Sequence, residues 1–204
     1  RKGVSLYTIR TIGRSAHAGL EPEAGVNSAV ELAHQILAIA GLGDAGAGTT
    51  VTPTVVSAGT TMNTVPGEAR VAVDVRVATL DEQERVDVAL RALNAVLPEA
   101  RLAVEGGPNR PPMEAGSSAD LFRLGQELAH RLGLGDSTGV AVGGASDGNF
   151  TAGVGTATLD GMGAVGGGAH ADDEHVVIAE IPSRTALLAA MIRAVSTPGE
   201  AHAD

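Results

Sequence analysis

The sequence contains no cysteine, no tryptophan and no long apolar run, and each absence excludes a class of protein. Without cysteine there is no disulfide and no thiolate metal site, so any metal ion must be bound by imidazole and carboxylate groups. One tyrosine and two phenylalanines are too few to stack nucleic-acid bases. No apolar segment is long enough to span a bilayer, and the opening Arg1-Lys2-Gly3 leads into no signal peptide, so we expect a cytoplasmic protein outside the membrane.

Positive charge is also scarce. The net charge is −10, from 14 lysines and arginines against 24 acidic residues, and no basic stripe is present. This excludes nucleic acid as a partner, because its phosphates require clustered cations. A length of 204 residues with 44% hydrophobic and 19% charged residues is typical of a globular protein with one large or two small domains. Because the first residue is not methionine, we expect a piece of a longer polypeptide.

The first hundred residues alternate between strand and helix patterns. Strands are expected over 4–12, 51–57, 69–77 and 101–105, and helices over 27–40 and 79–97. Apolar spacing and the capping boxes Ser28 with Glu31 and Thr79 with Glu82 predict the helices. Alternation along 69–77 puts Asp74 on the face opposite a row of valines. The order predicts a ferredoxin-like βαββαβ fold, with both helices on one face of the sheet.

The pattern changes after a glycine- and proline-rich stretch over 106–116, which predicts a linker and two domains, 1–112 and 113–204. Beyond it we expect a helix over 121–132, short strands over 139–142, 156–159 and 176–178, and a final helix after Pro182. These elements make a thin α/β layer. We therefore expect them to pack against a segment that this chain does not supply.

Two local strings suggest chemistries of their own. Gly144-Ala-Ser146-Asp-Gly matches the G-x-S-x-G nucleophile elbow, with Asp160 and His170 following in the order of the α/β-hydrolases. An elbow needs a helix directly after the serine, and residues 149–153 are weak helix formers. Residues 161–166 match G-x-G-x-x-G, but more glycines follow where a dinucleotide site needs a helix N-terminus.

Three further residues are candidates for binding. His170 lies in a glycine-flanked loop before an acidic run, which suits either a metal ligand or a solvated charged loop. His17 lies in a turn of small residues at a strand end, where a ligand could reach it or where it is simply a surface histidine. Arg76 stands two residues from Asp74, so it forms either a surface ion pair or a fork for a carboxylate.

Together these strings resemble one family, the M20 metallopeptidases and amidohydrolases, which includes glutamate carboxypeptidase, acetylornithine deacetylase and succinyl-diaminopimelate desuccinylase. The matching strings are 13–19, 25–27, Gly59 with 63–66, 74–76, 143–148, and 168–170 with Glu174, in the family's order. The resemblance implies that residues 1–112 are a dimerisation (lid) domain. It implies that residues 113–204 are the C-terminal part of an α/β zinc-peptidase catalytic domain.

The resemblance also implies roles for individual residues. His170 would be a ligand of zinc, of which the complete enzyme holds two ions. His17 would act in trans, reaching with Asn63 into the active site of the partner subunit of a homodimer and donating to the developing oxyanion. The substrate, a small molecule with a free carboxylate, would be bound by Arg76, Gly144 and Ser146.

The family's other metal ligands and its glutamate general base lie in an N-terminal half that has no counterpart in this chain. We therefore expect part of a hydrolase, of carboxypeptidase or N-acyl-amino-acid deacylase type, that cleaves an amide or peptide bond next to a free carboxylate. The chain alone is expected to be inactive. The alternative is a non-catalytic dimerisation module without a metal site.

Overall fold

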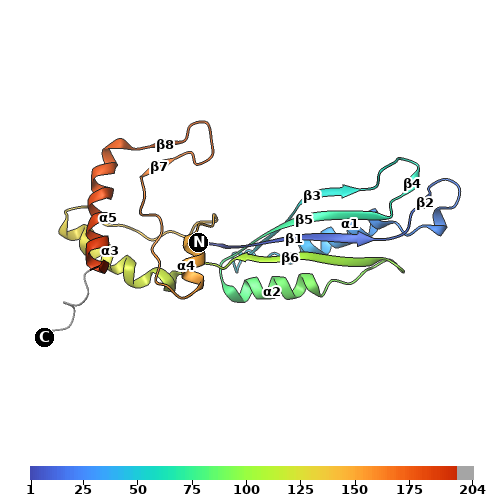
Figure 1. Ribbon diagram of the computed structural model, residues 1–204, viewed down its shortest axis with the longest axis horizontal. Helices are drawn as coiled ribbons and strands as arrows, with labels where there is room; N and C mark the ends of the chain where they lie inside the picture. Colours follow the sequence, from blue (N-terminus) through green and yellow to red (C-terminus); the bar gives the residue numbers. More distant parts are fainter. Residues whose placement is uncertain (197–204) are drawn as a thin grey trace. The chain divides into compact units, whose positions relative to one another are not determined.

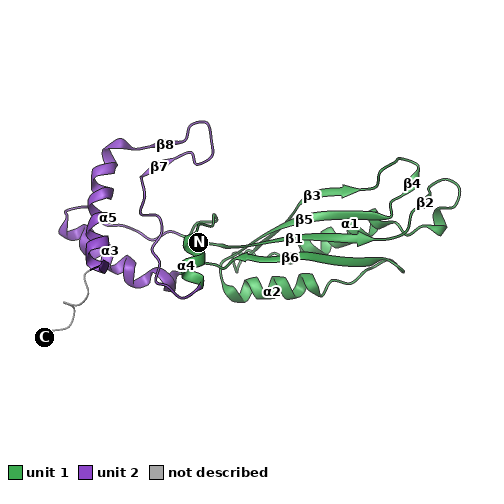
Figure 2. Ribbon diagram, in the orientation of Figure 1, with its two compact units in different colours: residues 1–114, 141–153 green, residues 115–140, 154–204 purple. Residues whose placement is uncertain are grey.

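The computed structural model describes residues 1–196, so the last residues of the predicted second domain lie outside the described part of the chain. Two compact units are present (Figures 1 and 2). The first comprises residues 1–114 and 141–153, and the second comprises 115–140 and the residues from 154 onwards. Residues 141–153 therefore return to the first unit after the chain has entered the second.

A four-stranded antiparallel sheet forms the first unit, with strand order β3-β5-β1-β6 (Figure 1). Its strands are β1 (Gly3–Ile12), β3 (Thr50–Ala58), β5 (Glu68–Val77) and β6 (Arg101–Arg110). Helix α1 (Ser28–Ala40) follows β1, and helix α2 (Leu80–Arg91) follows β5. This order confirms the predicted mixed α/β fold with its βαββαβ arrangement.

The core lies between the sheet and the two helices. Along β5, Val71, Val73, Val75 and Val77 are at most 2% exposed, and they pack with apolar residues of β1, α1 and α2. Successive strand residues point to opposite faces. The intervening side chains of β5, among them Asp74 and Arg76, therefore lie on the face that the helices leave open.

The N-cap of helix α1 is one residue earlier than the sequence predicted. Asn27 is the N-cap, and its side chain accepts hydrogen bonds from the amides of Ala29 and Val30. The predicted capping box is wrong because Ser28 and Glu31 are both buried and bonded elsewhere. The Ser28 hydroxyl donates to the carbonyl of Pro66 at 2.8 Å.

Helix α2 begins as predicted, with the Thr79 hydroxyl accepting from the amide of Glu82, but it ends at Arg91 rather than at Pro98. Glu31 of α1 binds the segment that follows the helix. Its carboxylate accepts hydrogen bonds from the amides of Val96 and Leu97 at 2.7–3.1 Å, so these amides do not continue the helix.

Strand β6 extends to Arg110, so the first half of the predicted linker is wrong. Gly106 and Gly107 continue the strand with φ angles of 91° and 157°, which other residues rarely adopt. The register with β1 then shifts between Pro108 and Arg110. A Cβ on Gly106 would lie 2.2 Å from the carbonyl oxygen of Leu6. Pro108 is tolerated because β6 is an edge strand.

The second unit is built on helices α3 (Ala119–Arg131) and α5 (Ile181–Ser196) and a two-stranded hairpin of β7 (Gly166–Gly167) and β8 (His175–Val176). The strands predicted over 139–142 and 156–159 are wrong, since no strand pairs with either segment in residues 1–196. A strand requires a neighbour to bond its backbone. In the described chain, no helix is long and apolar enough to cross a membrane.

Candidate functional site

His17 and Asn63 lie next to each other at the end of the sheet. Short strands β2 (Ala16–His17) and β4 (Thr64–Val65) pair there, with His17 opposite Thr64. The amide of Ala18 donates to the carbonyl of Asn63 at 2.9 Å. Two residues far apart in sequence are therefore brought to one tip of the first unit, close to the labels β2 and β4 in Figure 1.

Glycines of the sequence motifs allow this tip to form. The backbones of Arg14 and Val26 exchange hydrogen bonds of 3.0 and 2.9 Å. A Cβ on Gly13 would lie 2.0 Å from the Val26 carbonyl oxygen, and one on Gly25 would lie 2.9 Å from the Val65 side chain. A larger residue at position 13 would have to move the backbone, and one at position 25 would have to displace the Val65 side chain. Close packing therefore favours glycine at both positions.

The ring of His17 is exposed, but its orientation is set by the turn that follows. Its Nδ1 atom accepts hydrogen bonds from the amides of Gly19 and Leu20, at 3.1 and 3.2 Å. The Nε2 atom is on the opposite side of the ring. Asn63 is also exposed, so both side chains are accessible to a ligand.

Arg76 forms a bidentate ion pair with Asp74 on the open face of the sheet. Its Nε and Nη2 atoms donate to the two carboxylate oxygens at 2.7 and 2.8 Å, and hydrogen bonding to Asp74 raises the pKa of the guanidinium. Both side chains remain about one-third exposed, at 35% and 29%. The predicted ion pair and the predicted carboxylate fork are compatible, because Asp74 occupies only one edge of the guanidinium.

The loop containing Gly144 and Ser146 is anchored to the strand ends by Asn149. Asn149 is fully buried, and its amide nitrogen donates to the carbonyls of Lys2 and Pro111 at 3.1 and 2.8 Å. Its side-chain oxygen accepts from the Ser146 amide at 2.9 Å. Sequence reasoning missed Asn149, because a buried amide in a glycine-rich segment has no local signal.

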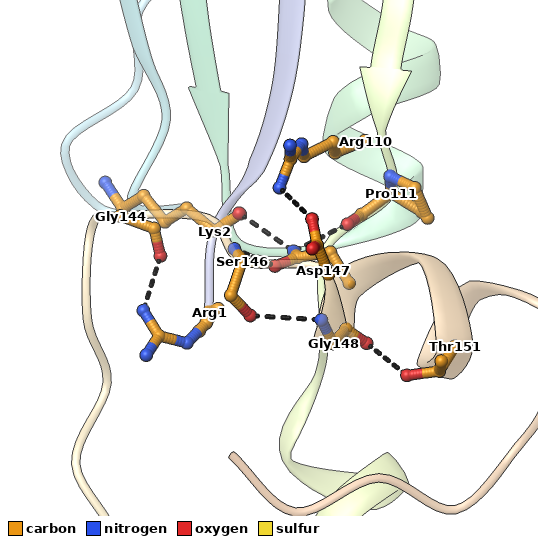
Figure 3. Close-up of polar contacts among 10 residues, drawn as sticks. Arg1, Lys2, Arg110, Pro111, Gly144, Ser146, Asp147, Gly148 and Thr151 are labelled. Atoms are coloured by element: carbon orange, nitrogen blue, oxygen red, sulfur yellow. Dashed lines mark hydrogen bonds and ion pairs between the residues drawn. The ribbon is translucent and has the colours of Figure 1, made fainter. Parts of the chain in front are cut away.

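Two arginines also hold this loop. Arg1 donates to the Gly144 carbonyl at 3.2 Å, and Arg110 pairs with Asp147 at 3.3 Å (Figure 3). The Ser146 hydroxyl accepts from the Gly148 amide at 3.2 Å. The loop is thus fixed at several points within the first unit.

The nucleophile-elbow interpretation is not supported. Helix α4 (Gly148–Gly153) does follow Ser146, so the prediction of a weak helix there is wrong. However, an elbow requires a strand directly before the serine, and residues 132–145 form none.

His170 lies in the turn between β7 and β8. Its φ angle is 66°, a left-handed conformation that is uncommon outside glycine and that clusters at functional positions. The His170 amide donates to the Glu174 carboxylate at 3.3 Å. The last glycine of the G-x-G-x-x-G string already belongs to strand β7 and no helix follows directly, so a dinucleotide site is not formed.

No three histidine or acidic side chains gather closely enough to bind a metal ion anywhere in residues 1–196. A catalytic zinc site needs about three protein ligands. The described residues therefore do not form a metal centre by themselves, and His170 is a candidate for one ligand only.

The sequence matches one family model and one curated relative. Residues 1–102 match the model of the peptidase dimerisation domain. Carboxypeptidase G2 from Pseudomonas sp. (strain RS-16) is 30% identical over 195 residues, which are 93% of this chain and 47% of that protein. The chain thus spans about half the length of this curated relative.

Solved structures share the fold. A tripeptidase from Staphylococcus aureus matches with a TM-score of 0.69 and 22% identity, over 95% of this chain and 52% of that one. Aminopeptidase PepT from Bacillus cereus matches with a TM-score of 0.64 and 21% identity, over 96% and 52%. At these identities the likeness concerns the fold alone.

Proposed function

The chain belongs to the M20 peptidase family, and on this premise we propose that it is the dimerisation domain and C-terminal catalytic part of a metal-dependent amide or peptide hydrolase. The proposal depends on one observation above all, the pairing of β2 with β4 that places His17 beside Asn63. A tetrahedral intermediate needs preorganised hydrogen-bond donors. An imidazole and a carboxamide at an exposed tip can supply them to a second subunit.

Association through the edge of β3 would bring that tip to a partner. The nine residues of β3 include no charged side chain, and Val55 is 69% exposed. Both edge strands contain a proline and a shift in register. The opposite edge strand, β6, differs in having charged residues such as Arg101 and Glu105, which oppose edge pairing. We therefore assign the homodimer interface to β3.

Helix α1 extends the same surface. It packs over the β3 side of the sheet, whereas α2 packs over the β6 side. The outer face of α1 has the exposed apolar side chains Val30 and Leu37 beside His34. Exposed apolar side chains continuous with an uncharged strand edge are typical of an interface between subunits.

Arg76 would bind the free carboxylate of the substrate. A guanidinium forms two parallel hydrogen bonds with a carboxylate, and it gives a protein of net charge −10 a local attraction for an anion. Gly144 and Ser146 would contact the substrate backbone. His170 would supply one zinc ligand, and zinc, when bound, acts as a Lewis acid and activates water.

The experiment joins this chain to the part of carboxypeptidase G2 that lies outside the match. The hybrid is expected to hydrolyse an N-acyl amino acid in a zinc-dependent manner, and not the same compound with its carboxylate amidated. His17→Ala is expected to lower kcat at least a hundredfold with unchanged zinc content, since one oxyanion donor contributes about that factor. Full activity of His17→Ala would contradict the role of His17.

A non-catalytic dimerisation module is the second candidate, favoured by the lack of a metal-binding cluster in the described residues. A calorimetric titration of the chain alone with zinc tests this alternative. Tight binding of two ions would exclude this alternative. A folded, zinc-binding hybrid that hydrolyses no amide would support the alternative over the hydrolase.

A further inference from the structure

The turn after β2 directs two backbone amides at the ring of His17. We infer that the amides of Gly19 and Leu20 fix His17 in the tautomer that has its proton on Nε2. The neutral ring then presents a hydrogen-bond donor to the ligand. The inference deepens the proposed function, because it says in which chemical form His17 would meet an oxyanion.

The argument begins with what a backbone amide can do. It has a proton and no available lone pair, so it only donates. Two amides point at Nδ1, from Gly19 at 3.1 Å and from Leu20 at 3.2 Å. Nδ1 must therefore accept, and the proton of a neutral imidazole must be on Nε2.

The turn is also held by a backbone bond that does not involve the ring. The carbonyl of His17 accepts from the amide of Glu21 at 3.2 Å, while the Leu20 amide is shared between this carbonyl, at 3.4 Å, and Nδ1. Strand pairing with Thr64 fixes the other side of the residue. The two amides are thus already oriented in the absence of substrate, as preorganisation requires.

Side chains of the turn contribute little to this arrangement. Leu20 is 76% exposed, and a Cβ on Gly19 would meet the His17 ring at the ordinary contact distances of 3.8 and 3.9 Å. Only the backbone N–H groups carry the effect. A substitution that keeps the amide should leave the tautomer unchanged, whereas proline, which has no N–H, should not.

The consequence for catalysis follows from charge. An oxyanion is stabilised by an N–H group and repelled by a ring nitrogen with a bare lone pair. With Nδ1 occupied by the two amides, the exposed nitrogen of the neutral ring is always the donor. Gly19 and Leu20 are therefore positioning residues, acting through His17.

The test is nuclear magnetic resonance of the chain as it stands, labelled with ¹⁵N, at about pH 8.5, where imidazoles are neutral. His17 is expected to show one tautomer, protonated on Nε2, with couplings across the hydrogen bonds from the Gly19 and Leu20 amides to Nδ1. His34 and His130, exposed on helices, serve as references for rings that exchange between tautomers.

Leu20→Pro is expected to weaken the coupling pattern and to shift the His17 nitrogens toward the reference values, while Leu20→Ala should match the parent protein. A His17 spectrum equal to that of the references, or a proton on Nδ1, would overturn the inference without any variant. Near-ultraviolet circular dichroism of Tyr7 verifies that each variant is folded. This experiment measures no hydrolysis. Its outcome is therefore distinguishable from a failure of the proposed enzyme activity.

Discussion

At the scale of single residues, Arg76 shows how a binding group can be aligned before its ligand arrives. Asp74 engages the Nε and Nη2 atoms. The remaining end of the planar guanidinium is left to face a second carboxylate. Asp74 would therefore act on substrate binding indirectly, by orienting Arg76.

We predict that Asp74→Asn raises KM for a carboxylate substrate about tenfold in the active hybrid, equivalent to about 1.4 kcal/mol, with little change in kcat. The reason is that the amide binds the guanidinium more weakly and leaves it less ordered. Steady-state kinetics measures the effect. Glu105→Gln is the control and should leave KM unchanged, because Glu105 pairs with Arg10 and lies on strand β6, which is separated from β5 by β1.

At the scale of elements, helix α1 is held to the loop after α2 by a buried carboxylate. Burial alone would raise the pKa of Glu31, but hydrogen bonds from Leu97, Gln35 and Val96 outweigh it and keep the pKa below the ordinary 4.5. A carboxyl group with a lowered pKa in the folded state stabilises the protein above the pKa of the unfolded state. That stability is lost as the pH falls through the folded pKa.

Glu31→Gln is predicted to lower the free energy of unfolding by about 2 kcal/mol at neutral pH, because buried amides lose a charged acceptor. The deficit should shrink below pH 4.5, where the parent carboxyl also becomes protonated. Urea unfolding followed by near-ultraviolet circular dichroism suits this measurement, since Tyr7 is the single tyrosine, no tryptophan is present and Tyr7 lies in the first unit.

Glu84→Gln, at an exposed position of α2, provides the control for charge alone. It should change the unfolding free energy by less than about 0.5 kcal/mol, both at neutral pH and at the acidic pH used for Glu31→Gln. Equal effects of the two substitutions would mean that the buried hydrogen bonds of Glu31 contribute nothing specific.

At the scale of the whole molecule, the proposed interface makes the oligomeric state sensitive to one helix and not to the other. Leu37 on α1 and Val88 on α2 are similarly exposed, at 75% and 60%. Only Leu37 lies on the helix that covers the β3 side of the sheet. The two positions therefore form a matched pair.

Leu37→Glu is expected to weaken dimerisation at least tenfold, or about 1.4 kcal/mol, because it places a charge in an apolar interface. Val88→Glu should leave the dimer intact. Sedimentation equilibrium over a range of concentrations measures both dissociation constants. Equal weakening by the two variants would place the interface elsewhere.

The in-trans role of His17 predicts complementation between two inactive subunits. In the hybrid enzyme, a His17→Ala subunit retains His170, and a His170→Ala subunit retains His17. A mixed dimer should therefore contain one complete active site, with activity that rises from near zero when the two are mixed. Mixtures that stay inactive while exchanging subunits would show that His17 acts within its own chain.

Sequence patterns predicted those parts of the protein that depend on neighbours in the chain. Alternation along β5 identified the two faces of the central strand, and Thr79 marked the start of α2, because side-chain periodicity and helix capping are local effects. The motif strings identified the family. Candidate residues such as His17 and Arg76 could be named from the sequence because they lie within these motif strings.

Only the tertiary structure decided which residues meet. The apolar stripe of α1 predicted a helix, yet Val30 and Leu37 are exposed, while Glu31 and Gln35 are buried with Leu32. The buried carboxylate is stable there because its partners come from a distant loop. The pairing of His17 with Thr64, the bonds from Asn149 to Lys2 and Pro111 and the bonds of Glu31 to the segment after α2 have the same origin. They are hydrogen bonds between segments far apart in sequence, which no local pattern encodes.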